Sequence, residues 1–180
     1  MKGIIFTTFS QMVEETFNLD MLDELLEQVK PKSDGIYISG ETYEDAELFS
    51  LVRALSTKTG VSVEDLIRSF GSYAFKHLVY MYPKCVEDAQ NARQLLLNVH
   101  GIIHVEVRKL HPDAQLPTFR YETPSPNKLT MFYHSSRKLY ALAEGLIDGV
   151  AQHYGETIER KTTELHENGE TFYRFDLIFK

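Results

Sequence analysis

Residues 128–138 read KLTMFYHSSRK and have the pattern of a β-strand that ends in polar side chains. Alternate residues of an extended chain point to the same side, so Tyr133, Ser135 and Arg137 are expected to share one face. All three side chains donate hydrogen bonds, and an arginine can bind a carboxylate through two parallel bonds. The segment therefore predicts a site for a flat apolar ligand with adjacent carboxylates, although such alternation also arises by chance on half-exposed strands.

The first part of the chain, to about residue 112, has the apolar periodicity of helices. Residues 5–13 and 22–29 repeat apolar side chains at helical spacing. Two pairs have the spacing of helix N-terminal caps, Thr42 with Asp45 and Ser62 with Asp65. Residues 86–110 are predicted to form one long helix, which Gly101 weakens in its middle.

The second part, from about residue 113, has strand-like alternation. The expected strands are residues 118–123, 128–135, 156–165 and 171–179, with a helix over residues 138–153. Asn168 and Gly169 form a hairpin signal between the last two strands. The final strand has one apolar face that the helix is expected to cover, made by Tyr173, Phe175, Leu177 and Phe179. The sequence thus predicts one α+β domain over residues 1–180: an N-terminal helical block followed by an antiparallel sheet of about four strands with an inserted helix.

Composition and charge narrow the functional classes. With 26 acidic and 19 basic residues the formal charge is -7, and no basic cluster suggests binding to nucleic acid or to an anionic membrane. No apolar run approaches the roughly 18 residues of a membrane span, and no secretion signal is recognised, so a cytoplasmic protein is expected. The single cysteine, Cys85, is expected to be a semi-buried structural thiol. No phosphate loop or nucleophile motif occurs, so no enzymatic activity is expected.

His100 and His104 lie one helical turn apart and are expected to face the same side of a helix. Such a pair can bind a metal ion, but Gly101 stands where the zinc-protease pattern requires a glutamate base. A metal-dependent hydrolase that uses both histidines remains an alternative. A hydrogen-bonded structural role is the ordinary alternative for a histidine on an apolar helix.

Three further features, taken with Tyr133, Ser135 and Arg137, resemble the H-NOX family, the haem domains related to the sensor region of soluble guanylate cyclase. They are MKGI at the N-terminus, His104 followed thirteen positions later by Pro117, and AEGLIDG at residues 143–149. The resemblance covers essentially the whole chain. It implies one noncovalent haem b between the helical and sheet subregions, with His104 as the ligand of the iron.

The same resemblance gives roles to the residues around the haem. Tyr133, Ser135 and Arg137 would hold its carboxylates, and Pro117 and Ile5 would press on opposite faces of the porphyrin. The gas-binding side would be lined by apolar residues, Ile5, Phe9, Ala74, Leu78, Leu142 and Leu146. Composition alone would make these ordinary core residues.

Two of the apolar positions bear on gas selectivity. Oxygen-binding members of the family have a tyrosine at the position of Leu142 and an amide at that of Ala74. Iron-bound oxygen carries negative charge and requires such a donor, whereas nitric oxide does not. The pocket is therefore expected to bind nitric oxide and carbon monoxide and to exclude oxygen. Tyr140 is expected to point away from Leu142, whereas the hydroxyl of Tyr73, next to Ala74, is the group most able to alter the selectivity.

The function implied by the resemblance is that of a gas sensor in which His104 releases the iron when nitric oxide binds. The signal would pass to a separate protein, for which the family suggests a histidine kinase, or alternatively a cyclic-di-GMP synthase or phosphodiesterase. A second class of function is a haem-free interaction or small-molecule-binding module with the same fold. The colour of the purified protein separates these two classes.

Overall fold

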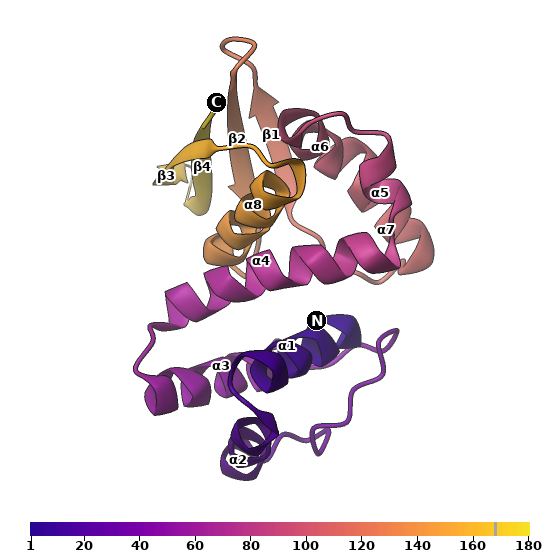
Figure 1. The fold of residues 1–180 in the computed structure, drawn as a ribbon, viewed down its shortest axis with the longest axis vertical. Coiled ribbons are helices and arrows are strands. Elements are labelled where there is room, and N and C mark those ends of the chain that lie inside the picture. The colour runs from indigo at the N-terminus through magenta and orange to yellow at the C-terminus, as the bar shows by residue number, and fades with distance from the viewer. Residues whose placement is uncertain (168) are drawn as a thin grey trace.

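The computed structural model describes residues 1–167 and 169–180, without the side chain of Cys85. The predicted turn at Asn168 and the predicted packing of Cys85 therefore lie outside the described residues. The chain begins with α1 (Gly3–Thr16), α2 (Leu19–Val29), α3 (Asp45–Thr59) and α4 (Val63–Met81). The first three helices form a block at one end of the molecule, and α4 runs alongside it (Figure 1). Within the described residues, no helix has the length and apolar character needed to cross a membrane.

The two predicted helix caps have different outcomes. Ser62 accepts a hydrogen bond from the Asp65 amide at 3.1 Å and donates to its carboxylate at 2.6 Å, which confirms the predicted start of α4. The corresponding prediction for Thr42 and Asp45 is wrong, because α3 begins at Asp45 without a side-chain cap. Both side chains have distant partners instead: Thr42 donates to Asp113 and Asp45 accepts from Arg137.

The prediction of one helix over residues 86–110 is also wrong. A single turn, α5 (Lys84–Glu87), comes first, and a new helix begins at α6 (Ala92–Asn98). The side chain of Asn91 accepts a hydrogen bond from the Gln94 amide at 2.8 Å, so this residue caps a helix start rather than continuing a helix. The helix then continues through a five-residue π-helical turn, η1 (Val99–Ile103), into α7 (His104–Leu110).

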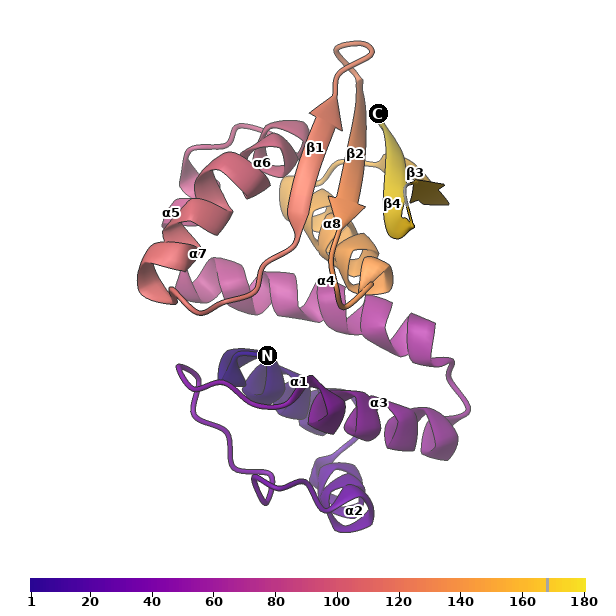
Figure 2. The same ribbon diagram turned by 180° about the vertical axis from the view of Figure 1, so that it is seen from behind.

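An antiparallel sheet makes up the other end of the molecule. Its strands are β1 (Thr118–Glu122), β2 (Lys128–His134), β3 (Ile158–Glu167) and β4 (Glu170–Phe179), in the spatial order β1-β2-β4-β3. The helix α8 (Tyr140–Tyr154) lies against one face of this sheet (Figure 2). Tyr173, Phe175 and Leu177 of β4 are buried in one core with Ile147 and Val150 of α8. The predicted apolar face and the predicted α+β class are therefore confirmed.

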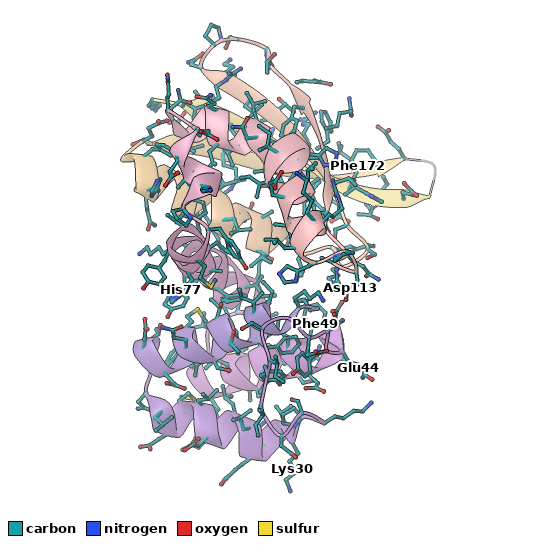
Figure 3. All side chains as sticks on the ribbon, turned by 90° about the vertical axis from the view of Figure 1, so that its right-hand side faces the viewer. Lys30, Glu44, Phe49, His77, Asp113 and Phe172 are labelled. Carbon is teal, nitrogen blue, oxygen red and sulfur yellow. The ribbon has the colours of Figure 1, made fainter. Side chains whose placement is uncertain are left out.

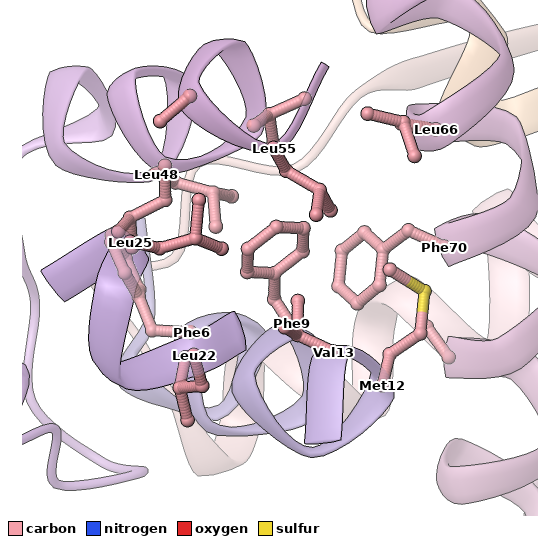
Figure 4. Close-up of a cluster of buried hydrophobic side chains, with 14 residues drawn as sticks. Phe6, Phe9, Met12, Val13, Leu22, Leu25, Leu48, Leu55, Leu66 and Phe70 are labelled. Atoms are coloured by element: carbon pink, nitrogen blue, oxygen red, sulfur yellow. The ribbon is translucent and has the colours of Figure 1, made fainter. Parts of the chain in front are cut away.

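Two apolar cores meet within α4. The first lies among α1–α4 and includes Phe6, Phe9, Leu25, Leu55 and Phe70 (Figure 4). The second contains Phe75 together with apolar residues of α6, α8 and the sheet. Since Ala74 belongs to the first core and Phe75 to the second, α4 connects the helical block to the rest of the molecule.

The crossing of α4 and α8 depends on two glycines. A Cβ atom on Gly145 would lie 1.9 Å from the carbonyl oxygen of Arg68, and one on Gly71 would lie 2.9 Å from the Cα atom of Gly145. Any larger side chain would therefore separate the two helices. An ion pair of 2.8 Å between Arg68 and Asp148 joins the same helices. Because α8 also covers the sheet, this crossing fixes the sheet relative to the helical block.

Candidate functional site

His104 is the first residue of α7, directly after the π turn. Its Nδ1 atom is buried and has no hydrogen-bond partner among the described residues. Burial, and to a smaller extent His100 and Arg108, lowers the pKa of His104 to about 4, while the carbonyl of Pro117 acts in the opposite direction. The imidazole is therefore neutral at pH 7, which is the form that ligates metals. An unpaired buried nitrogen requires an explanation in a folded protein, and metal ligation provides one.

The rings around His104 come from β1 and from the preceding helical turn. The ring centroids of His104 and Phe119 are 5.8 Å apart, and those of His104 and His100 are 6.4 Å apart. Unlike Nδ1 of His104, Nδ1 of His100 has a hydrogen-bond partner: it accepts from the Phe119 amide at 3.4 Å. The described residues also contain no group of three or more His, Cys, Asp or Glu side chains arranged to hold a metal ion, the ligand set that the alternative hydrolase requires.

The three predicted donors gather where β2 ends. Tyr133 lies within β2 and is buried, whereas Ser135 and Arg137 follow the last strand residue, His134. The hydroxyl of Ser135 accepts a hydrogen bond from the Arg137 amide at 3.2 Å, so the chain turns between these residues, and the expectation that all three alternate along one extended strand is wrong. Burial raises the pKa of the Tyr133 phenol, while the neighbouring Ser135 and the Leu139 backbone lower it.

The Arg137 guanidinium already binds a carboxylate in this structure. Its Nε donates to Asp45 Oδ2 at 2.5 Å, and its two terminal nitrogens donate to the backbone carbonyl and side-chain oxygen of Gln115 at 2.8 and 3.3 Å. The pKa of Asp45 is lowered, because the hydrogen bonds and charges of Arg137 and the N-terminus outweigh the effect of burial, which raises it. Sequence reasoning missed both partners of Arg137, since Asp45 lies 92 residues away in the chain and no local pattern marks the pair.

A second ion pair joins the segment after α7 to the helical block. Lys2 Nζ lies 2.7 Å from a carboxylate oxygen of Asp113, and Thr42 donates to the same carboxylate at 2.9 Å. The hydrogen bond from Lys2, followed by that from Thr42, lowers the pKa of Asp113 to about 2. Figure 3 shows Asp113 at the junction between the helical block and the rest of the molecule. Asp113 therefore connects the end of the His104 helix to the N-terminal segment.

An apolar pocket lies between α1, α3, α4 and the start of α8. Its volume is about 10 Å³, the room of one water molecule, and every lining residue is apolar. Ile5 and Leu142 line this pocket, while Phe9 and Ala74 are buried in the adjoining helical core. The other two predicted gas-side residues differ in placement: Leu146 packs against the sheet core, and Leu78 is half-buried on α4, one turn after Ala74.

Neither nearby tyrosine is turned toward this pocket. Tyr140 stacks on Tyr173 with 4.4 Å between ring centroids, so it faces the sheet, as predicted. The hydroxyl of Tyr73 is buried without a hydrogen bond of good geometry, and burial followed by the nearby Glu15 carboxylate raises its pKa. Glu15 is ten residues from Ile5 on α1, roughly 15 Å along the helix axis. The Tyr73 hydroxyl therefore lies toward the far end of α1 from the pocket.

These residues fit the chemistry of a haem. The iron of a haem takes an axial imidazole, for which His104 offers a neutral, unpaired nitrogen. Its two carboxylates suit a guanidinium, and Arg137 already binds one carboxylate here. The small apolar pocket suits a diatomic gas, which needs no polar partner there. The fold and the site together define a haem-binding domain of the α+β class.

The chain belongs to the haem-NO-binding family, also called H-NOX, whose family model matches residues 2–162. The Fe(II) unliganded H-NOX protein of K. algicida is similar to it with 36% identity and a TM-score of 0.91, covering 100% of this chain and 97% of that one. The H-NOX protein of S. oneidensis in its Fe(II)NO state has 30% identity and a TM-score of 0.92, with 100% and 99% covered. No curated protein matches the chain. The resemblance predicted from sequence is confirmed: H-NOX domains bind haem and are sensor domains rather than enzymes.

Proposed function

We propose that the chain is a haem-based sensor of nitric oxide that excludes oxygen and signals to a separate protein in the cytoplasm. The whole chain acts as one sensor domain. The observation that carries this proposal is the neutral His104 imidazole, whose Nδ1 atom is buried without a hydrogen bond of good geometry in a chain of the H-NOX family. When bound, a ferrous haem would supply an iron able to bind a diatomic gas.

His104 would ligate the iron, and the donors at the end of β2 would hold the haem carboxylates. Arg137 supplies a charged fork, while Tyr133 and Ser135 supply neutral hydroxyls. The support for this assignment is that Arg137 binds a carboxylate in the protein itself, that of Asp45. Pro117 and Ile5 would contact the porphyrin, and the nearness of the Pro117 carbonyl to His104 supports the placement of Pro117.

Selectivity for nitric oxide and carbon monoxide over oxygen follows from an apolar gas side. Leu142 and Ala74 provide no hydrogen-bond donor, and the pocket that Leu142 lines is apolar throughout. Tyr73 and Tyr140, the two donors that could change this, are turned toward Glu15 and Tyr173. The S. oneidensis relative has been described in Fe(II)NO and Fe(II)CO states, which supports both gases as ligands.

The ligand state is read on the surface by a partner, a histidine kinase first and a cyclic-di-GMP synthase or phosphodiesterase as the alternative. Release of His104 frees its helix to move relative to the helical block. Two ion pairs lie across that junction, Lys2 with Asp113 and Arg137 with Asp45. A change at His104 can therefore reach the contact between the two subregions, where a partner senses it.

Absorption spectra of the purified ferrous protein under nitrogen, air, carbon monoxide and nitric oxide test this function. We expect a haem spectrum that changes with both carbon monoxide and nitric oxide and does not change in air beyond slow oxidation. A persistent oxygen complex would contradict the proposed selectivity, and its loss in Tyr73→Phe would identify the donor. A colourless protein that takes up no added haem would favour the haem-free module.

A further inference from the structure

We propose that the π turn at Val99–Ile103 is the hinge that positions His104, and that Tyr121 is the positioning residue that holds this hinge in its wide form. The inference rests on the proposed function, because it concerns how His104 is presented and released. π turns are rare and often occur at functional sites. This one ends at Ile103, directly before the residue that we assign as the iron ligand.

The hinge is defined by its backbone hydrogen bonds. The amide of His104 donates to the carbonyl of Val99, five residues earlier, whereas an α-helix would use the carbonyl of His100. The turn therefore contains one residue more than an α-helical turn. None of its five residues is fully buried, and Ile103 packs against the sheet core, so the wide form is held mainly at the edge of that core.

Two hydrogen bonds from β1 hold the turn in place. The amide of His100 donates to the Tyr121 hydroxyl at 3.4 Å, and the amide of Phe119 donates to Nδ1 of His100 at 3.4 Å. Tyr121 is a firm support, because its ring lies parallel to that of Phe119 and packs against the sheet core. Burial raises the pKa of Tyr121 to about 12, so its hydroxyl remains neutral at pH 7. Because both bonds are long, each contributes little and can be broken at low cost.

Gly101 makes the hinge easier to change. A Cβ atom at this position would meet nothing within 4 Å, and its φ angle lies outside the left-handed region. Neither space nor backbone conformation therefore requires glycine. What glycine contributes is a low preference for the regular helix, about 1 kcal/mol below alanine, which reduces the difference between the π and α forms.

Conversion of the turn would move His104 by a large, defined amount. Each residue of an α-helix advances the chain by about 100°. If the turn becomes α-helical, the extra residue joins the helix and everything after it rotates by about this angle relative to α6. The His104 side chain then leaves its position, and the segment that leads to Asp113 moves with it. The hinge thus couples release of His104 to the junction between the subregions.

Hydrogen exchange at the amides of residues 99–104, measured on the ferrous haem-loaded protein with and without nitric oxide, tests the hinge. We expect nitric oxide to change exchange at these amides by about tenfold in the wild type. Tyr121→Phe removes the hydroxyl that accepts from the His100 amide, so exchange of that amide should rise by about threefold without gas. Tyr154→Phe is the matched control, because its hydroxyl bonds the backbone of Val86 and Ala89 instead, and it should leave the π turn unchanged.

Deletion of Gly101 is the second variant. Removing one residue from a π turn restores α-helical bonding with the flanking segments in place, so nitric oxide should no longer change exchange in this turn and His104 should stay bound. If the deletion variant does not fold, the exchange measurement on Tyr121→Phe still tests the hinge. A protein that binds nitric oxide and releases His104 without any exchange change at residues 99–104 would overturn the hinge while the sensor function stands. A protein whose spectrum does not respond to nitric oxide would overturn the function itself, and the hinge with it.

Discussion

Arg137 connects the candidate haem site to the N-terminal block through a single side chain. Its guanidinium binds Asp45 at the start of α3 and both oxygens of Gln115 in the segment before β1. The Arg137 side chain is 16% exposed, and its bond to Asp45 is partly shielded from solvent. Any ligand carboxylate that Arg137 holds is therefore linked, through the same group, to the position of α3.

Replacement of the three donors should weaken haem retention to different degrees. Arg137→Ala removes charged hydrogen bonds and should speed haem loss by about tenfold or more, whereas Ser135→Ala removes a neutral group and should change it by severalfold at most. Tyr133→Phe should lie between. Haem transfer to an apo-globin acceptor gives the rates, and Asp45→Asn controls for loss of the ion pair alone. Equal rates for wild type and all three variants would remove these residues from the haem site.

Asp113 should give the protein a measurable acid sensitivity. Its pKa in the folded protein is about 2, below the value of about 3.9 in an unfolded chain. The contribution of the ion pair with Lys2 to the free energy of unfolding is therefore complete above about pH 4, and it is lost as the pH falls toward 2. Urea unfolding at pH 5 and pH 3 should show a smaller loss of stability for Asp113→Asn than for wild type. Asp23→Asn, an exposed change on α2, should behave as wild type, and the same loss in both variants would contradict the assignment.

At the scale of elements, the contact between α4 and α8 is the one that tolerates least change. Gly145→Ala would place a methyl group against the backbone of Arg68 and should destabilise the protein by about 1–3 kcal/mol or more. Gly40→Ala is the control, since a Cβ atom there meets nothing within 4 Å. Thermal or urea unfolding compares the two. Equal stability would mean that the helices separate at little cost.

The elements were predictable where a local pattern determines them. All four strands and α8 lie close to their predicted ranges, because alternation and helical spacing are readable within a few residues. The interruption of the helix expected over residues 86–110 was not predictable in this way. The side chain of Asn91 caps a new helix there, although the apolar pattern continues across it. The π turn is hydrogen-bonded to Tyr121 and Phe119, which are distant in the chain and leave no periodic signal.

Most residues of the candidate site were predicted from the resemblance to the H-NOX family rather than from the spacing of residues in the sequence. His104 and His100 look alike as residues of a helical pair, and only burial, seen in the structure, leaves the Nδ1 of His104 unpaired while that of His100 has a partner. Arg137 was predicted to bind a carboxylate, but its partner Asp45 was predicted to be a helix cap. Partners on separate elements are set by the tertiary fold, which a single sequence does not reveal.

At the scale of the whole molecule, α4 contributes to both apolar cores. Two ion pairs, Lys2 with Asp113 and Asp45 with Arg137, also join the helical block to the second part of the chain. Because the α4–α8 crossing fixes the sheet on the helical block, a change at the haem site is expected to act through these two ion pairs. Pro117→Ala should relax the haem pocket and so partly reproduce the effect of nitric oxide on the partner, altering kinase or cyclic-di-GMP enzyme activity without gas. Partner assays with ferrous, nitric-oxide-treated and Pro117→Ala protein test this. Identical activity in all three states would favour haem storage or a structural role.

The central claim is that His104 is the residue that holds the iron, and replacement of the two histidines tests it most directly. The measurement is the ferrous absorption spectrum of His104→Gly and His100→Gly, each prepared with and without added imidazole. The account predicts that His104→Gly retains haem stably only when imidazole replaces the missing ring, whereas His100→Gly keeps a wild-type spectrum without it. An unchanged spectrum in His104→Gly together with loss of haem in His100→Gly would contradict the account.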